Sequence, residues 1–296
     1  MTYAAIRCDA VADGLDDAPG LDSPSLGQKE FAAIVRIMQS EARIHLSDVK
    51  RTLVHSRLSR RLRMHRIASF ADYLQRIEHD PEERAAMVVA LTTNHTFFFR
   101  ENHHFEHLRG EVIPRLKEAA RSRPVRLWSA GSSSGEEVYS IAMCLSGANR
   151  HDAAWLTKGD VRLLATDLSP PMVATVQKGV YPANAANSIP EPWRSAWTRI
   201  EDGELRIAPE LRALVTARTL NLFERWPMRQ SYDVIFCRNV MIYFDDKAKA
   251  ELEARLADML RPGGFLYIGH SERLIGAAAV AMKSCGHTIY SKNGGF

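Results

Sequence analysis

Residues 128–137, WSAGSSSGEE, are the stretch whose residue types and spacing best suit ligand binding. Apolar residues, then small ones, then two glutamates are typical of a strand, a tight loop and a helix start. Small residues let a ligand approach the backbone, and N–H groups at a helix start attract polar groups. The G-x-x-x-G spacing from Gly131 to Gly135 fits neither dinucleotide enzymes nor a P-loop. Because Glu136 and Glu137 would repel phosphate, a cationic ligand without phosphate is favoured; the alternative is a plain strand-to-helix turn.

Polar residues also follow two later apolar runs. Asp167 ends one of them, where an acid in a doubly wound fold reaches the ribose hydroxyls of a nucleoside. The alternative for Asp167 is an ordinary cap of the helix expected to begin near Ser169. Arg238, Asn239 and Tyr243 follow the other run. Since ligands bind at the carboxyl ends of parallel strands, all of these side chains lie at the expected binding edge.

The segment 92–100, TTNHTFFFR, places three aromatic residues before a single arginine. At least part of the triplet Phe97–Phe99 is expected to lie in the core. Arg100 beside it would then be half-buried and would need an anionic partner. A carboxylate of a substrate or of a cofactor is one candidate for that partner.

One surface of the chain is expected to be strongly basic. Residues 41–66 carry a net charge of +6, so the rest of the chain sums to −2. Arg57, Arg60 and Arg61 are spaced i, i+3, i+4 and share one face of a helix. This face is either an ordinary solvated surface or a docking site for an acidic partner.

The elements that must position these residues follow from hydrophobic periodicity. Apolar residues at helical spacing over 28–90 predict a small helical bundle, with Asp80 and Pro81 starting one helix. Further on, short apolar runs alternate with helical patterns, which predicts an α/β fold with a doubly wound, mostly parallel sheet. The expected strands are 125–129, 161–165, 233–237 and 265–268, and the expected helices are 136–145, 169–177 and 246–260.

The predicted domain order is therefore helical first and α/β second. Residues 1–27 are rich in Asp, Gly and Pro and are expected to form a mobile tail. Residues about 181–220 interrupt the alternation, and their runs 205–208 and 214–220 predict a small inserted antiparallel piece. The domains are a tail over 1–27, a helical domain over 28–90, a linker and cofactor-contacting segment over 91–123, and an α/β domain over 124–296.

Composition excludes several classes of protein. With 46% hydrophobic and 25% charged residues among 296, the chain can bury a core and is not disordered over most of its length. It lacks the ~18 consecutive apolar residues of a membrane helix, and its acidic first residues are not expected to act as a secretory signal. Four cysteines without a C-x-x-C pair argue against a metal site or a disulfide framework, and suit a cytoplasmic location.

The motifs that carry a family resemblance are TTNHTFFFR, WSAGSSSGEEVYS, ATD, FCRNVMIYF and the following GHSE. With them, the chain resembles the bacterial chemotaxis receptor methyltransferases of the CheR type. The resemblance extends from about residue 28 to about residue 292. It implies methyl transfer from S-adenosylmethionine to glutamate side chains of chemoreceptor cytoplasmic helical bundles. It also implies a helical domain joined to a class I methyltransferase domain with a small antiparallel β insertion.

The resemblance assigns roles residue by residue. Arg100 and Tyr243 would face the transferring methyl group as catalytic residues. A basic helix would meet the receptor through Arg57, Arg60, Arg61 and Arg63. The implied cofactor contacts are Asn94, Thr96, Arg100, Glu137, Asp167, Asn221, Leu222, Arg238 and Asn239.

The chain departs from the family at one informative place. Some relatives use a longer loop in the inserted piece to capture a peptide tethered at the receptor C-terminus. Here only Glu201-Asp-Gly-Glu204 separates the first two candidate strands, which argues against a tether and favours direct docking through the basic helix.

Three other functions compete with this interpretation. A nucleic-acid methyltransferase would also use a basic face, but base-modifying enzymes of this fold often carry Asn/Asp-Pro-Pro-aromatic where this chain has Cys237-Arg-Asn-Val. A non-catalytic module that senses S-adenosylmethionine would need the same pocket. A nicotinamide oxidoreductase ranks last because the glycine spacing is wrong.

Overall fold

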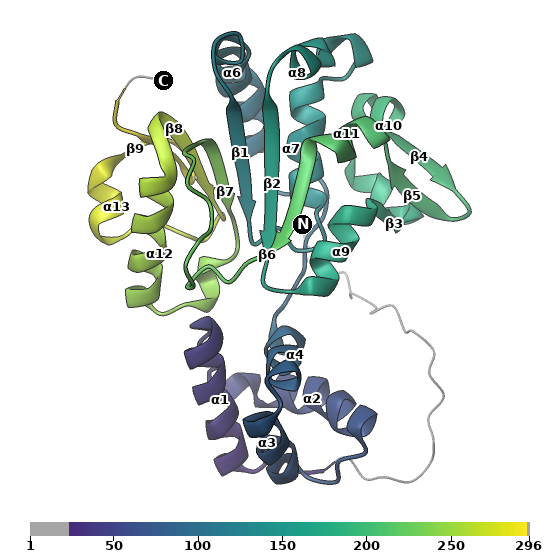
Figure 1. The fold of residues 1–296 in the computed structure, drawn as a ribbon, viewed down its shortest axis with the longest axis vertical. Helices are drawn as coiled ribbons and strands as arrows, with labels where there is room; N and C mark the ends of the chain where they lie inside the picture. The colour runs from purple at the N-terminus through teal and green to yellow at the C-terminus, as the bar shows by residue number, and fades with distance from the viewer. Residues whose placement is uncertain (1–23, 295–296) are drawn as a thin grey trace, which may run out of the picture.

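The computed structural model describes residues 24–294. A helical domain lies below a larger domain built on a twisted sheet (Figure 1). The predicted mobile tail lies outside the described residues as far as residue 23. The helical domain consists of α1 (Gln28–Ala42), α2 (Arg51–His65), α3 (Phe70–His79) and α4 (Pro81–Leu91).

The four helices form the expected bundle around their own core. Ile34, Met38, Leu58 and Tyr73 are fully buried there, at the helical spacing that predicted the domain. Asp80 accepts a hydrogen bond from the backbone N–H of Glu83, which confirms it as the N-cap of α4.

The larger domain is built on a seven-stranded sheet with the order β6-β2-β1-β7-β8-β10-β9. Its first five strands in that order are parallel, and β10 and β9 complete one edge in antiparallel pairing. This is the mostly parallel, doubly wound sheet that the alternating pattern predicted. The strands are β1 (Val125–Ala130), β2 (Val161–Asp167), β6 (Val215–Thr219), β7 (Tyr232–Cys237), β8 (Leu260–Ile268), β9 (Met282–Gly286) and β10 (Ile289–Lys292).

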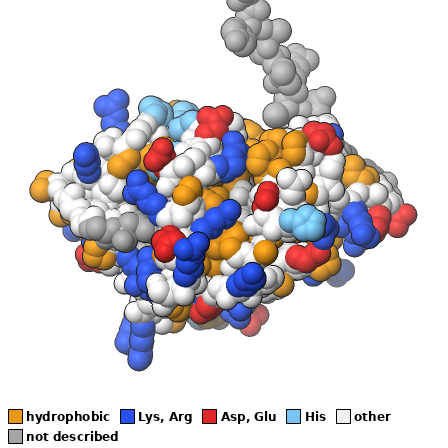
Figure 2. Space-filling model, turned by 90° about the horizontal axis from the view of Figure 1, so that it is seen from above, with side chains coloured by type: hydrophobic (Ala, Val, Ile, Leu, Met, Phe, Trp, Pro, Cys, Tyr) orange, Lys and Arg blue, Asp and Glu red, His pale blue; other side chains and the backbone are white. Residues whose placement is uncertain are grey.

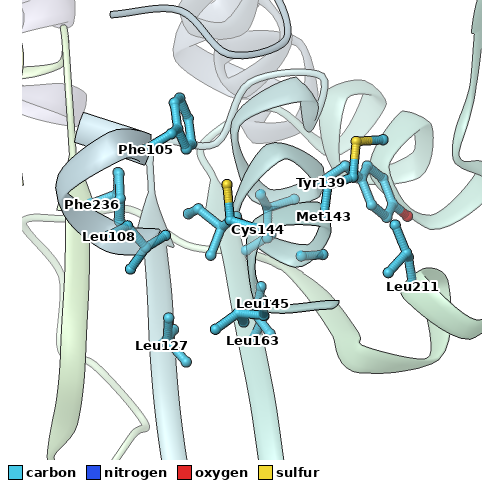
Figure 3. Close-up of a cluster of buried hydrophobic side chains, with 14 of the residues drawn as sticks. Phe105, Leu108, Leu127, Tyr139, Met143, Cys144, Leu145, Leu163, Leu211 and Phe236 are labelled. Atoms are coloured by element: carbon cyan, nitrogen blue, oxygen red, sulfur yellow. The ribbon is translucent and has the colours of Figure 1, made fainter. Parts of the chain in front are cut away.

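Helices cover both faces of the sheet (Figure 1). Successive residues of a strand point to opposite faces, so Leu127 and Phe236 belong to one core, and Trp128 and Cys237 to the other. Figure 3 shows Leu127 and Phe236 packing among side chains of α7, with Phe105 beside them. The helices of this domain are α5 (His103–His107), α6 (Ile113–Ala119), α7 (Glu136–Ser146), α8 (Ala154–Lys158), α9 (Pro170–Lys178), α10 (Glu191–Trp197), α11 (Pro209–Leu214), α12 (Asp246–Met259) and α13 (Gly276–Ala281).

The inserted piece is smaller than predicted. It contains β3 (Val180–Pro182), β4 (Thr198–Glu201) and β5 (Glu204–Ile207) as an antiparallel sheet. The run 214–220 was assigned to this piece, and that assignment is wrong. As β6, the run pairs in parallel with β2 in the main sheet. Its alternating pattern is that of a strand at the sheet edge, where one side remains exposed.

The segment 91–123 is more than a linker. α5 and α6 are joined by a π-helical turn and pack on the sheet, with Phe105, Leu108 and Leu116 fully buried. The two domains also touch directly, since Ile44 forms a β-bridge with Phe244. No helix within residues 24–294 is long and apolar enough to cross a membrane.

Figure 2 shows the end of the molecule farthest from the helical domain. Basic and acidic side chains are interspersed there with hydrophobic ones. The mixture differs from the predominantly basic sequence of α2 at the other end of the molecule.

Candidate active site

A cavity of about 380 Å³ lies between the helical domain and the carboxyl ends of the parallel strands. Its size falls within the usual range of small-molecule sites. Every residue assigned above to catalysis or cofactor binding lines it. These residues are Asn94, Thr96, Arg100, Glu137, Asp167, Asn221, Leu222, Arg238, Asn239 and Tyr243.

The glycine-containing loop after β1 forms one wall of the cavity. Gly131 has φ of 75°, and a Cβ there would lie 2.5 Å from a methyl group of Val240. Only glycine fits both the backbone conformation and the space. The backbone N–H groups of Gly131 and Ser132 donate to the carbonyl of Thr166, which ties the loop to the end of β2.

Asp167 serves the protein structure while lining the cavity. Its Oδ2 accepts a hydrogen bond from the N–H of Ser133 at 2.8 Å, and its Oδ1 accepts one from the N–H of Ser169 at 2.9 Å. Burial raises the pKa of the carboxyl group, and these backbone donors oppose that rise. Asp167 therefore joins the glycine-containing loop to the start of α9 while it lines the cavity.

The aromatic triplet before Arg100 is divided between core and surface. Phe98 and Phe99 are buried, whereas Phe97 is 43% exposed at the cavity wall. Phe99 and Glu101 have φ of 56° and 58°, a left-handed conformation that is unusual for these residue types. The turn places Arg100 at the cavity, where its Nη1 donates to the carbonyl of His95 at 2.8 Å.

A buried charge cluster adjoins this turn, and two of its members, Glu137 and Arg238, line the cavity. The side chain of Arg238 is 2% exposed and lies 3.2 Å from Glu101 and 3.1 Å from Glu137. Burial alone would raise the pKa of Glu101, but Arg238 and hydrogen bonds from His270 and Asn239 lower it to about 2. Burial raises the pKa of Glu137 against the opposing charge of Arg238. The cluster joins the segment after α4, helix α7 and the end of β7.

Two other cavity residues lie where the domains meet. The Asn221 side chain donates to the carbonyl of Glu41 at 2.7 Å, and the Tyr243 carbonyl accepts from the N–H of His45 at 2.9 Å. The amide group of Asn221 is therefore already engaged within the protein. The docking of α1 and the following loop against the sheet closes this side of the cavity.

The four arginines expected to meet a partner have different surroundings. Arg57 donates to the carbonyl of Thr92 at 2.6 Å, directly before the cavity segment. Arg61 forms a bidentate pair with the buried Glu83. Arg60 and Arg63 are exposed, and in the part of the chain that the structure describes neither forms an ion pair. A second cavity, of about 950 Å³, is lined by Arg57, Arg60 and Arg61, together with residues of α4 and Pro170 and Pro171.

Comparison with known families assigns both domains. Residues 29–92 match the all-alpha domain of CheR methyltransferases, and residues 94–290 match the S-adenosylmethionine-binding domain. The chain belongs to the CheR methyltransferase family. It is thus an S-adenosylmethionine-dependent chemotaxis methyltransferase, as the motifs predicted.

Relatives in the CheR family match over nearly their whole lengths. The chain is 40% identical over 262 residues to a probable chemotaxis protein methyltransferase of Rhizobium etli, which covers 86% of this chain and 96% of the relative. It is 41% identical over 253 residues to chemotaxis protein methyltransferase 2 of Pseudomonas aeruginosa, covering 84% and 87%. A chemotaxis protein methyltransferase of Borreliella burgdorferi is 33% identical over 259 residues, covering 85% and 90%.

The donor set of the CheR cavity fits S-adenosylmethionine. Asp167 would offer carboxylate oxygens to ribose hydroxyls, and Leu222 and Phe223 would provide apolar surfaces for the base. Glu137 suits the ammonium group of the methionine portion, and Arg100 suits its carboxylate.

Sequence reasoning missed two carboxylates that organise the CheR site. Glu101 was not singled out, although it follows Arg100 directly, and its carboxylate contacts Arg238, Asn239 and His270. Glu272 lies within the quoted GHSE motif but received no role. A signal for both existed, since each glutamate lies in or directly beside a motif expected to be at least partly buried, and a buried carboxylate needs a partner.

Proposed function

We propose that this CheR methyltransferase converts glutamate side chains on the cytoplasmic helices of chemoreceptors into methyl esters. The observation that carries the proposal is a single cavity that combines cationic, anionic and hydroxyl-binding side chains beside a basic helix. A glutamate-rich helix is the complementary surface for exposed arginines.

The chemistry needs little acid–base assistance. S-adenosylmethionine supplies a methyl group on a positively charged sulfur. A glutamate carboxylate, with an ordinary pKa near 4.3, is already ionised at neutral pH and can displace that methyl group without a general base. The main tasks of the protein are therefore alignment and exclusion of water, and alignment can supply ~7–11 kcal/mol.

Arg100 and Tyr243 are proposed to provide that alignment. Both line the cavity, and Arg100 is held in place by the His95 carbonyl. We assign Arg100 to orienting a carboxylate and Tyr243 to holding the attacking oxygen in line with the methyl group. His95, His103 and His104 have no assigned part; His104 is fully buried and bonded to Thr288.

The direct test is incubation with radiolabelled S-adenosylmethionine and receptor cytoplasmic fragments. Base-labile label on the fragment supports ester formation on glutamate. Stable label on RNA or DNA would instead indicate a nucleic-acid methyltransferase. Binding of S-adenosylmethionine by calorimetry without any transfer would indicate a sensing module.

Docking is proposed to use Arg60 and Arg63, because Arg57 and Arg61 are engaged within the protein. The double variant R60E/R63E is expected to raise the KM for the receptor fragment at least tenfold, because two attractive charges become repulsive. The difference from the unaltered protein should shrink as salt rises. The kcat and the affinity for S-adenosylhomocysteine should not change.

Initial rates over a range of receptor and salt concentrations measure this effect. The variant R115E/R121E makes the same charge change on another exposed surface and serves as the control. Equal KM values for the two double variants would contradict docking through α2.

The turn Asp202-Gly203 between β4 and β5 has only two residues, so a receptor tether is not part of the proposal.

A further inference from the structure

Two buried glutamates lie on the side of the sheet covered by α12. Glu253 on α12 is 0% exposed, and Glu272 after β8 is 6% exposed. Within residues 24–294, neither forms an ion pair with Lys, Arg or His. Burying a carboxylate without a cation costs free energy unless hydrogen bonds stabilise it. Each of the two glutamates therefore needs hydrogen-bond donors.

Three backbone N–H groups stabilise the buried carboxylate of Glu272. Its Oε2 accepts from the N–H groups of Gly269 at 2.5 Å and Asn239 at 3.1 Å, and its Oε1 accepts from that of Ile242 at 3.2 Å. Gly269 follows β8, whereas Asn239 and Ile242 belong to the loop after β7. One carboxylate therefore holds together the loops that follow two adjacent strands.

The loop held in this way contributes directly to the cavity. Asn239 adopts a left-handed φ of 58°, which turns the chain directly after β7. The amide of Asn239 also donates to Glu101 at 3.3 Å, and the short turn that begins at Met241 ends at Tyr243. Both Asn239 and Tyr243 line the cavity.

Space around this contact is tightly filled. A Cβ on Gly269 would lie 2.6 Å from the side-chain nitrogen of Asn239, 2.7 Å from its backbone nitrogen and 2.9 Å from Glu272 Oε2. Gly269 therefore approaches Asn239 and Glu272 so closely that a side chain would not fit between them.

We propose that Glu272 is a positioning residue for methyl transfer, which sets Asn239 and Tyr243 through the backbone of their loop. The proposal rests on the proposed function, because Tyr243 is assigned there to the transferring methyl group. Glu272 does not line the cavity, so it acts only through these neighbours.

Glu253 provides a matched control. Its Oε2 accepts one hydrogen bond, from the N–H of Ile275 at 2.6 Å, and its Oε1 has no hydrogen-bond partner among the described residues. Burial and the nearby Glu272 raise its pKa to about 7. Glutamine resembles the protonated form in shape, so E253Q removes a carboxyl group equally close to the core without touching the loop after β7.

The experiment compares E272Q with E253Q in two assays. Calorimetry with S-adenosylhomocysteine needs no receptor, and initial-rate kinetics use the receptor fragment. The amide of E272Q would point an N–H₂ group at backbone donors that need an acceptor. We expect at least tenfold weaker binding of S-adenosylhomocysteine and a tenfold lower kcat, with an unchanged KM for the receptor fragment. E253Q should match the unaltered protein in all three quantities.

Thermal unfolding shows whether E272Q is folded at the assay temperature. Should it not fold, G269A replaces it, since the added methyl group separates Glu272 from Asn239, and the same losses are expected. Binding and kcat within twofold of the unaltered protein in a folded variant would overturn the proposal. Equal losses in E253Q would also overturn it, by showing a general effect of buried carboxylates. If the unaltered protein methylates no receptor fragment, the proposed function fails, while the binding comparison still decides the part played by Glu272.

Discussion

Replacing Arg238 by methionine is expected to lower the free energy of unfolding by about 3–5 kcal/mol and to abolish cofactor binding. Methionine fills a similar volume but leaves Glu101 and Glu137 facing each other in a buried site without their shared cation. The carbonyl of Arg100 would lose its donor as well. Because total stability is typically only about 5–15 kcal/mol, such a loss is large enough to detect by urea unfolding.

The control is R121M, which removes an arginine from an exposed pair with Glu118. Exposed pairs contribute about 0–1 kcal/mol, so this variant should unfold like the original protein. Calorimetry with S-adenosylhomocysteine completes the comparison at a temperature where R238M is folded. Equal unfolding midpoints for the two variants, or retained binding by R238M, would show that the charge cluster does not organise the cavity.

The arrangement of the site was predictable because parallel strands end at one edge. Asp167 and Asn239 are 72 residues apart in sequence, but Asp167 ends β2 and Asn239 follows β7. The two strands flank β1 and end at the same edge of the sheet, which brings both residues into one cavity. The run 214–220 was not predictable in the same way. An edge strand alternates like a strand of an antiparallel hairpin, and only its pairing with β2 distinguishes the two.

The sequence also did not predict which buried side chains pair with each other. Periodicity shows that a residue faces inward or outward, but it does not show which carboxylate meets which arginine. Glu83 lies on α4 and Arg61 on α2, 22 residues apart, and only the packing of the two helices brings them together. Glu101 likewise contacts residues more than 130 positions away in sequence, and only the folded structure shows these contacts.

The variant R61M is expected to destabilise the protein by about 3 kcal/mol while leaving the KM for a receptor fragment unchanged. Glu83 is 4% exposed and accepts hydrogen bonds from Arg61, from the Tyr73 hydroxyl at 2.6 Å and from His65. Without the guanidinium group, the buried carboxylate would keep only neutral or weakly basic donors. Urea unfolding measures the loss, and kinetics at low temperature measure the KM.

R60M is the matched control, because Arg60 precedes Arg61 on α2 and is exposed. It should unfold like the original protein and raise the KM for the receptor fragment. The two variants therefore distinguish a structural role of Arg61 from a docking role of Arg60, which the sequence alone could not do because both residues lie on one helix face. A raised KM for R61M without loss of stability would return Arg61 to the docking surface, and its pair with Glu83 would then have to open when the receptor binds.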